Sequence, residues 1–260
     1  MTSPSATERV GIVVPTIGGR PEYLPLALLS IREAGNAHII VVKKKGLDLT
    51  KLQEAGLIDE CFDEPASDVA SAINLGIRAM PSDVRYVSWL GDDDLLTPDS
   101  LTKSLSRITA PDEPIMVFGS CDYIDHIGKK IFTMKSGSWA VPLMRFGPDL
   151  IPQPGSLFRR GAFETVGGLR TDLGWAFDFD LFLAFSKIGS LAFLPEILSK
   201  FRWHPGSLSV KSRRDSVREA SAVRKAHLPK ALRTVSEIWE WPVREATYVA
   251  GIRVSRKLEK

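Results

Sequence analysis

Short apolar runs alternate with amphipathic segments along the first half of the chain. The run VGIVV at 10–14 is rich in β-branched residues and ends at Pro15, as expected for a buried strand. Leu24, Leu28 and Ile31 then recur at the spacing of a helix. The same reasoning predicts strands at 10–14, at 38–42, near 61 and 62, and at 86–90, and helices at 22–34 and at 67–80, the latter capped by Ser67 or Asp68. Strands that alternate with helices favour a parallel sheet of the Rossmann type.

The second half of the chain has a less regular pattern. It predicts strands at 115–120 and 130–134 around a turn at 125–128, a helix at 160–166, a helix that starts after Asp178 within 174–189, and a mostly extended segment at 191–209. From about residue 212 we expect a basic helical tail. Pro229 and Pro242 should interrupt it, because proline cannot continue the hydrogen bonding of a helix.

Composition narrows the class of protein. The chain has 260 residues, of which 44% are hydrophobic and 25% charged, and this suits one large α/β domain or two small ones. Cys61 and Cys121 are far apart in the sequence, so neither a disulfide framework nor a zinc site is expected. No apolar run reaches the roughly 18 residues of a membrane span, and the N-terminus lacks the apolar core of a signal peptide. These features predict a cytoplasmic protein.

The C-terminal segment differs from the rest in charge. Residues 211–260 contain 13 basic and 6 acidic residues, a net charge of +7, whereas the whole chain has a net charge of +3. Apolar residues near helical spacing lie among them, namely Leu228, Leu232, Val235, Ile238 and Trp239. Such a helix could lie peripherally on the anionic inner face of a membrane, pack on the rest of the chain, form a homodimer, or be a solvated helical face. We expect no nucleic-acid partner.

Three consecutive aspartates follow the apolar strand at 86–90. Asp92, Asp93 and Asp94 come directly after Gly91, at the expected carboxyl end of that strand, where open α/β sheets bind ligands. Adjacent carboxylates repel one another unless a positive group lies near them. Because Mg²⁺ and Mn²⁺ prefer carboxylate ligands, one interpretation is a divalent metal site. The other is a solvated loop in which Asp94 or Asp99 caps the next helix.

Six segments of the chain occur in a characteristic order: VVPTIGGRPEYL, ASAINLGI, WLGDDDLLTPDSL, IPQPGSLFRRGAFETVGGL, AFDFDLFLAF and FRWHPGSLS. Over roughly residues 9–210, this series resembles the family 2 glycosyltransferases. The resemblance implies an α/β protein of the GT-A fold, with a Rossmann-like mixed sheet flanked by helices. The catalytic domain would then be 1–210, with a nucleotide-sugar-binding half at 1–110 and an acceptor-binding half at 111–210, followed by a basic helical extension at 211–260.

The resemblance also implies a metal site. Asp92 to Asp94 match the DXD element, which holds Mn²⁺ or Mg²⁺ together with the nucleotide diphosphate. Asp94 would ligate the metal, whereas Asp92 and Asp93 would contact the nucleotide sugar. His204 in FRWHPGSLS matches a histidine that completes the metal site in several relatives. A hydrogen-bonded core histidine is the alternative for this residue.

Other matched residues surround the donor. Pro15, Thr16 and Arg20 match the loop that lines the nucleotide pocket, and Asn74 matches the helix that faces it. After the second strand, however, many relatives have an aspartate that contacts the base, and this chain has KKKG at 43–46. Lysine cannot accept a hydrogen bond from a base N–H. This departure leaves the identity of the base open: a UDP-sugar is the favoured donor, and dTDP- and GDP-sugars are the alternatives.

Asp178 in AFDFD matches the acidic residue that these enzymes use as a general base. A carboxylate can take the proton of an acceptor hydroxyl, and a one-step displacement with such a base inverts the anomeric centre. Asp178 or Asp180 could instead cap the helix that begins there, and we expect a structural role for Asp180. The implied reaction is an inverting, metal-dependent transfer of a sugar to a glycan or lipid-linked acceptor, in polysaccharide or cell-envelope glycan synthesis. A nucleotidyltransferase that makes nucleotide sugars and a catalytically silent nucleotide or glycan binder are the alternatives.

Overall fold

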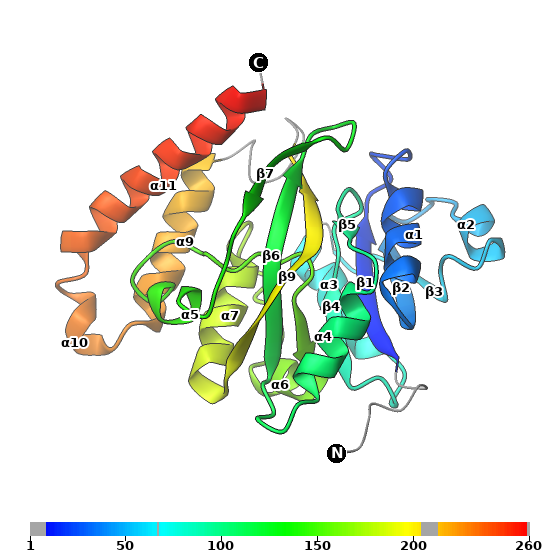
Figure 1. Cartoon of the computed structure of the whole chain (residues 1–260), viewed down its shortest axis with the longest axis horizontal. Helices are drawn as coiled ribbons and strands as arrows, with labels where there is room; N and C mark the ends of the chain where they lie inside the picture. The colour runs from blue at the N-terminus through cyan, green and yellow to red at the C-terminus, as the bar shows by residue number, and fades with distance from the viewer. Residues whose placement is uncertain (1–8, 67, 204–212, 259–260) are drawn as a thin grey trace.

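The computed structural model describes residues 9–66, 68–203 and 213–258, where a mixed sheet carries helices on both faces (Figure 1). Its strands are β1 (Val10–Thr16), β2 (Ala37–Lys43), β3 (Glu60–Asp63), β4 (Tyr86–Trp89), β5 (Leu95–Leu96), β6 (Met116–Ile124), β7 (Lys130–Met134), β8 (Leu157–Arg159) and β9 (Leu191–Arg202). The helices are α1 (Leu24–Ala34), α2 (Thr50–Glu54), α3 (Val69–Ala79), α4 (Ser100–Ile108), α5 (Ala140–Leu143), α6 (Arg160–Thr165), α7 (Phe177–Ile188), α9 (Arg213–His227), α10 (Lys230–Arg233) and α11 (Glu237–Leu258).

The sheet joins a parallel half to a half that is mostly antiparallel. β1 pairs in parallel with β2 and with β4, and β3 extends this half beyond β2. β8 then runs antiparallel between β4 and β6, and β9 pairs in parallel with β6. β7 and β5 add antiparallel partners to β6 and β9. The predicted α/β fold, with a mixed sheet flanked by helices, is confirmed.

The first strands are apolar throughout because they face two separate cores. Ile12 and Val14 of β1 belong to the core that α1 and α4 cover, whereas Val13 belongs to the core under α3, α6 and α7. Ile39 and Ile40 of β2 divide in the same way. Successive side chains of a strand point to opposite faces, so burial of both faces removes the polar alternation that one exposed face would produce.

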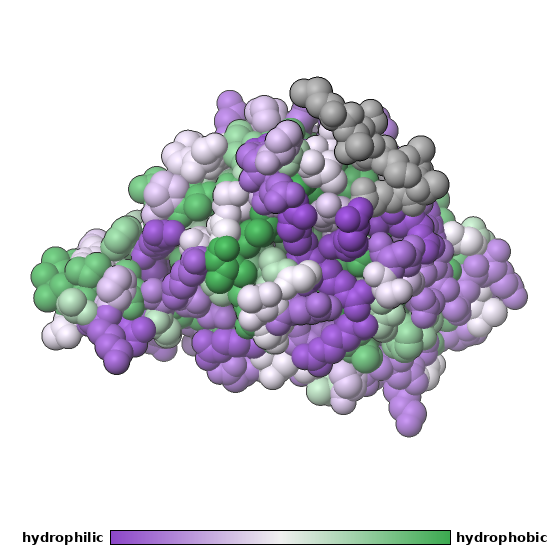
Figure 2. All heavy atoms as spheres, turned by 90° about the horizontal axis from the view of Figure 1, so that it is seen from below, coloured by the Kyte–Doolittle hydropathy of each residue, from purple (hydrophilic) through white to green (hydrophobic). Residues whose placement is uncertain are grey.

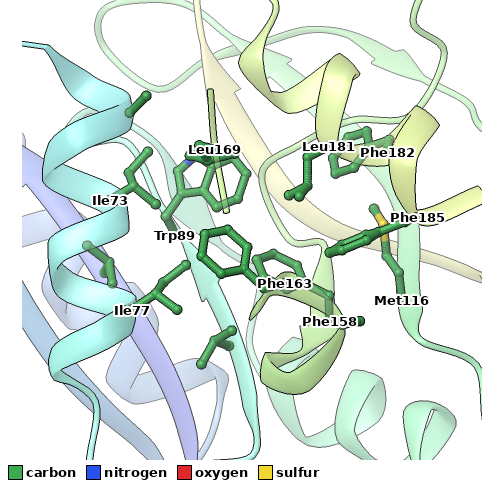
Figure 3. Packing of buried hydrophobic residues seen from close by; sticks show 14 of the residues in the cluster. Ile73, Ile77, Trp89, Met116, Phe158, Phe163, Leu169, Leu181, Phe182 and Phe185 are labelled. Atoms are coloured by element: carbon green, nitrogen blue, oxygen red, sulfur yellow. The ribbon is translucent and has the colours of Figure 1, made fainter. Parts of the chain in front are cut away.

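Trp89 at the end of β4 lies at the centre of the second core. Figure 3 shows it between Ile73 of α3 and the aromatic side chains of α7, which include Phe182. Its ring meets Phe158 of β8 edge to face, with centroids 5.8 Å apart, and Phe177 of α7 at 6.4 Å. This aromatic packing fixes the start of α7 close to the end of β4.

Sequence periodicity located most of the elements, but it missed α2, β5, α5 and β8, and it gave no bounds for α4, the helix after the aspartate triplet. α2 and β5 are too short to carry a periodic signal, whereas α4 does place Leu101, Leu105 and Ile108 at helical spacing. Asp99 occupies the N-cap position of α4, but its side chain makes no capping hydrogen bond. Asp68 caps α3 as predicted, since its carboxylate accepts the amide of Ser71 at 2.7 Å.

The C-terminal segment forms three helices, and only one of the two predicted proline interruptions occurs. The chain breaks between α9 and α10 at Pro229, as expected, but α11 continues through Pro242. Tertiary contacts hold the first turn of α11: Trp239 packs on the ring of Phe146, and Glu240 is fully buried in an ion pair with Arg224 of α9. The carbonyl that loses its helical partner belongs to Ile238, a residue that is 78% exposed. Within the described ranges, no helix has both the length and the apolar character needed to cross a bilayer.

Replacing Gly76 with alanine should destabilise the protein. Gly76 lies where α3 approaches β1, and an added Cβ would come within 2.6 and 2.7 Å of the two Val13 methyl groups. Overpacking of this kind typically costs about 1–3 kcal/mol. Gly161→Ala in α6 is the matched control, because an added Cβ there meets no atom within 4 Å. Urea unfolding should show a loss of stability for G76A only, and equal losses in both variants would contradict the close packing of α3 on β1.

Candidate functional site

A pocket of about 320 Å³ opens at the carboxyl ends of β1 and β4. These strands are parallel neighbours, so the loop after β1 and the aspartate triplet after β4 meet at one edge of the sheet. The N-terminal turn of α3, the first residue of α7 and the end of β9 supply the remaining walls. The pocket thereby brings together residues that the sequence analysis selected, namely Pro15, Thr16, Arg20, Asp92, Asp93 and Asp94.

The loop after β1 holds the first two aspartates. Arg20 Nη1 donates to Asp92 Oδ1 at 3.1 Å and to Asp93 Oδ2 at 2.7 Å. Thr16 Oγ1 donates to Asp92 Oδ2 at 2.6 Å. Burial raises the pKa of Asp92, and these donors oppose the shift because they favour the ionised carboxylate. The β1 loop thus supplies a positive charge and a hydroxyl donor to two of the three carboxylates.

Asp94 is buried more deeply than the other two aspartates. Its Oδ1 accepts the backbone amide of Arg202 at 2.9 Å, and Arg202 Nε donates to the Asp93 carbonyl at 2.9 Å. Loss of hydration and repulsion from Asp93 raise the pKa of Asp94 well above its usual range. A cation beside Asp94 would favour its ionised form. Neither Asp94 nor Asp99 makes a capping hydrogen bond to α4, so the capping alternative for the triplet is not observed.

Carboxylate oxygens converge beside Gly91. A Cβ built on this glycine would lie 3.0 Å from Asp93 Oδ1 and 3.0 Å from Asp94 Oδ2. Hard oxygen donors of this kind suit Mg²⁺ or Mn²⁺. In the part of the chain that the structure describes, no three acidic, histidine or cysteine side chains are grouped to hold an ion. His204, expected to complete the set, lies outside the described residues. The triplet therefore fits part of a metal-ligand set.

Asp178 lies in the first turn of α7, beside Phe177 in the pocket wall. Its side chain is partly buried, and Oδ1 accepts the Phe179 amide at 2.8 Å. Loss of hydration raises the pKa of Asp178 to about 6, and the negative charge of Glu219 adds to the shift. Asp178 itself is not among the residues that line the pocket. Asp180 pairs with His227 Nε2 at 2.9 Å, the structural role expected for it.

Asn74 does not line the pocket. Its Nδ2 donates to the Leu169 carbonyl at 2.8 Å, and its Oδ1 accepts the Leu169 amide at 2.9 Å. The side chain is buried and ties the turn before Leu169 to α3. This placement gives Asn74 a structural role in place of the nucleotide contact expected from the sequence.

The pocket also includes residues that the sequence analysis did not select. Glu64 follows β3, Gln153 lies before β8, and Phe201 is at the end of β9. Gln153 Nε2 donates to the Trp89 carbonyl at 2.9 Å and so bridges the two halves of the sheet. Gln153 belongs to the IPQPGS segment singled out in the sequence, although no role was assigned to it, whereas no local motif marks Glu64; only the fold brings these distant segments together.

A second and more open depression, of about 710 Å³, lies at the amino end of β4 and is remote from the aspartates. Arg159 and Arg160 line it, but backbone carbonyls engage both guanidinium groups. Arg159 donates to the carbonyls of Ile108 and Pro114, and Arg160 to that of Met80. These two arginines therefore stabilise the fold at the end of the sheet opposite the pocket.

Curated proteins that are similar to this chain are named glycosyltransferases. The chain is 26% identical over 212 residues to an uncharacterized glycosyltransferase of Rickettsia typhi and to one of Rickettsia prowazekii; each alignment covers 75% of the chain and 64% of the relative. It is 25% identical over 210 residues to one of Rickettsia felis, covering 75% of the chain and 34% of that relative. The chain thus spans between about one third and just under two thirds of these proteins. No protein-family model matches the sequence.

Solved structures share the fold. A mannosyltransferase from Pyrobaculum calidifontis, in complex with GDP-Man and Mn²⁺, superposes with a TM-score of 0.61 at 16% identity, covering 98% of this chain and 77% of that one. S. aureus TarS 1–349, in complex with UDP, gives 0.60 at 12% identity, covering 86% and 68%. At these identities the likeness establishes the fold alone, which is that of a known mannosyltransferase.

The raised pKa of Asp178 predicts a pH-dependent stability. The folded protein binds this proton more tightly than the unfolded chain does, because the pKa moves from 3.8 to about 6. Its contribution is therefore fully present below about pH 4 and is lost as the pH rises through 6. Asp178→Asn stays neutral, so it should lose less stability than the wild type between about pH 4 and 7, as thermal melts across this range would show.

Asp112→Asn is the control with the opposite sign. Its hydrogen bond to Arg107 lowers the pKa of Asp112, so this carboxylate stabilises the fold at higher pH. The Asp112 variant should therefore approach the stability of the wild type as the pH falls below about 4, and lie below it by a constant amount from about pH 5 upward. A stability profile of the Asp178 variant that runs parallel to the wild type would contradict the raised pKa.

Proposed function

We propose that the protein is an inverting, metal-dependent glycosyltransferase of the GT-A fold, which moves a sugar from a nucleotide diphosphate donor to a hydroxyl group. The observation that carries this proposal is the meeting of the aspartate triplet, the β1 loop and the start of α7 around one pocket. The names of the relatives and the fold shared with a mannosyltransferase support it. UDP in TarS and GDP-Man with Mn²⁺ in the mannosyltransferase agree with a donor of this class.

The charge of the pocket explains why a metal belongs to this proposal. Glu64, Asp68 and the aspartate triplet line the pocket together with Arg20, which pairs with Asp92 and Asp93. A diphosphate would add further negative charge to this surface and would be repelled. Asp93 and Asp94 would hold Mn²⁺ or Mg²⁺, with His204 as a further ligand suggested by the sequence, and the ion would neutralise the departing diphosphate.

The nucleotide would lie along the β1 loop. Pro15 and Thr16 form its wall, and Asp92 is held there by Thr16 and Arg20. Lys43 cannot supply the base contact expected after β2, and its Nζ already lies 2.7 Å from Asp63. Glu64, on the next strand connection, lines the pocket and can accept a hydrogen bond from a base N–H. A UDP-sugar stays the favoured donor, and dTDP- and GDP-sugars fit the same contact.

Asp178 would act as the base. The proton of the acceptor hydroxyl would pass to its carboxylate as the acceptor oxygen bonds to the anomeric carbon and the bond to the diphosphate breaks on the opposite side. A pKa of about 6 leaves the group ionised at neutral pH and still basic enough to accept a proton. The nucleotidyltransferase and silent-binder alternatives leave this carboxylate without a role.

The C-terminal surface suits an acceptor held at a membrane. Val235, Ile238 and Trp241 are 45%, 78% and 62% exposed, and Figure 2 shows hydrophobic residues gathered at the α10–α11 end of the molecule. Arg214 and Arg244 line an adjacent groove of about 410 Å³ between α9 and α11. Exposed apolar and tryptophan side chains beside arginines form the composition of an interfacial anchor. We propose that this surface binds an anionic bilayer, where a lipid-linked acceptor would lie.

The proposed surface keeps only some of the residues that helical spacing suggested. Val235 and Ile238 are exposed, whereas Leu228 is buried at the end of α9 and Trp239 packs edge to face on Phe146 with centroids 6.1 Å apart. Residues 228–239 do not form one helix, because the chain turns at Pro229 and again before α11.

Calorimetric titration of UDP, dTDP and GDP, each with and without Mn²⁺, tests the donor site. Wild type should bind one nucleotide in a metal-dependent manner, and Asp94→Ala should abolish this binding. Gly91→Ala should weaken it about 10- to 100-fold, because a Cβ there would displace oxygens of Asp93 and Asp94. Gly161→Ala is the control and should bind as wild type does. Nucleotide binding that is unchanged both without Mn²⁺ and in Asp94→Ala would contradict the proposed metal site.

Asp178→Asn distinguishes nucleotide binding, measured by the same calorimetry, from sugar transfer, measured by an activity assay. It should bind the nucleotide as wild type does, because the carboxylate lies beyond the pocket wall at Phe177. Transfer to an acceptor should fall about 10²–10⁴-fold, the typical value of a general base. Wild-type transfer by this variant would contradict the assignment of the base.

Co-sedimentation with vesicles tests the membrane surface. Wild type should sediment with vesicles of phosphatidylserine and phosphatidylcholine more than with phosphatidylcholine alone. The double variant Ile238→Asp/Trp241→Ala should lose this binding, whereas Ile127→Asp, at a residue that is 74% exposed in the β6–β7 turn, should keep it. Equal sedimentation of all three proteins would contradict the proposal, and a dimer in gel filtration that the double variant abolishes would assign the patch to self-association.

A further inference from the structure

The carboxylate of Glu219 binds three consecutive backbone amides of a distant segment. Its Oε2 accepts the amide of Gly174 at 3.0 Å, and its Oε1 accepts the amides of Trp175 and Ala176, each at 2.7 Å. Glu219 belongs to α9, in the C-terminal extension, whereas segment 174–176 leads directly into α7. A residue of the extension therefore completes the structure from which the proposed base projects.

The N-cap residue of α7 supplies no side-chain hydrogen bond. Ala176 occupies the N-cap position, and its methyl group cannot accept a hydrogen bond. Amides at the start of a helix have no partner within the helix, and a negative charge beside them is favoured by the helix dipole. Capping residues normally lie next to the helix in sequence. Here the acceptor comes from 43 residues away.

Asp178 stands two residues after the last of these amides. Its own carboxylate binds the Phe179 amide, so its position follows the backbone of this first turn. α9 makes two further contacts with the rest of the chain: His227 Nε2 lies 2.9 Å from Asp180 Oδ1 in the first turn of α7, and Arg224 Nη1 donates to the Gly147 carbonyl at 2.6 Å. Both residues follow Glu219, so these contacts fix the C-terminal half of α9 beside α7.

We propose that Glu219 is a positioning residue, which holds the start of α7 so that the Asp178 carboxylate stays where an acceptor hydroxyl would meet it. The inference rests on the proposed function for the role of Asp178, whereas the contact between Glu219 and segment 174–176 stands independently of it. If Glu219 has this role, α9 contributes to the acceptor side of the site, although it lies in the extension after residue 210.

The groups around Asp178 determine how this contact can be detected. The ionisable groups that face it are Glu219 of α9, Asp149 of the loop after α5, Tyr123 of β6, and, through Asp180, His227 and Arg170. Burial and the charge of Glu219 raise the pKa of Asp178, while the Phe179 amide lowers it. Removing the charge of Glu219 should therefore lower the pKa of Asp178, and a loss of fold stability alone would not.

The test compares Glu219→Gln with Asp215→Asn. Glutamine keeps the size of the side chain, removes its charge and replaces one acceptor oxygen with an amide group that cannot accept. Asp215 is the matched control, because it is an exposed acid on the same helix and its loss changes the net charge equally. With Mn²⁺ and the donor identified by calorimetry, both variants and the wild type are assayed for transfer across pH 5–9.

We expect kcat of the Glu219 variant to fall about 10- to 100-fold, because a displacement of about 1 Å at a reacting group can cost about 10²-fold. The KM for the donor should stay within about twofold, since no donor contact is removed. The acidic limb of its kcat profile should move to lower pH, and Asp215→Asn should match the wild type. A Glu219 variant with wild-type kcat and an unmoved acidic limb would overturn the proposal.

Hydrogen exchange of a peptide spanning 170–180 measures the same contact without an activity assay. Exchange should be faster in Glu219→Gln than in the wild type and in Asp215→Asn, and equal exchange in all three would overturn the proposal. Melting temperatures show whether the variant has lost its fold, and Glu219→Asp, which keeps the charge, should restore part of the protection. If the wild type neither binds a donor nor transfers a sugar, the proposed function fails, and exchange still decides whether Glu219 holds the start of α7.

Discussion

Electrostatic repulsion among three adjacent carboxylates at the end of β4 is the constraint that the surrounding structure satisfies. Each hydrogen-bond donor to the triplet comes from another strand or the loop after it. Thr16 ends β1, Arg20 lies in the loop that follows, and Arg202, whose amide donates, ends β9. These strands can reach the triplet only because β1 pairs directly with β4 and β9 returns to the same edge through β6 and β5. The order of the strands therefore determines which donors can reach the triplet.

The acidic groups at and near the pocket share the main cause of their raised pKa values. Loss of hydration raises the pKa of Asp92, of Asp94 and of Asp178, and that of Asp178 rises to about 6. The groups differ in their neighbours: Thr16 and Arg20 donate to Asp92, whereas Asp178 accepts a backbone amide and lies near the negative charge of Glu219. The different roles proposed for them rest on these neighbours.

The extension after residue 210 has two faces with different consequences. On its inner face, Glu219 and Arg224 bind the backbone at Ala176 and Gly147, and a buried ion pair joins Arg224 to Glu240. A charged pair in this setting is strongly destabilising if one partner is lost, so α9 and α11 are fixed to each other. On its outer face, Ile238 and Trp241 stay exposed beside arginines. The same segment thus braces the proposed base and presents the proposed membrane surface.

The sequence alone determined the elements whose signals are local. Apolar runs gave β1, β2 and β4 because both of their faces are buried, and helical spacing gave α1, α3 and α7. The aspartate triplet indicated a charged site, since three adjacent carboxylates repel one another unless a positive group lies near them. It also indicated the β1 loop, through the order of motifs that resembles a known family.

Only the tertiary structure decided which distant side chains complete the site. Asn74, which the sequence suggested as a contact of the nucleotide sugar, is hydrogen-bonded to Leu169. α11 runs through Pro242, because the contacts of Trp239 and Glu240 outweigh one lost hydrogen bond. Glu64 and Glu219 carry no motif, and their roles depend on strand order and on the docking of α9. Local patterns report hydrogen bonding and burial along one segment, whereas these roles arise from contacts between segments that are far apart in the sequence.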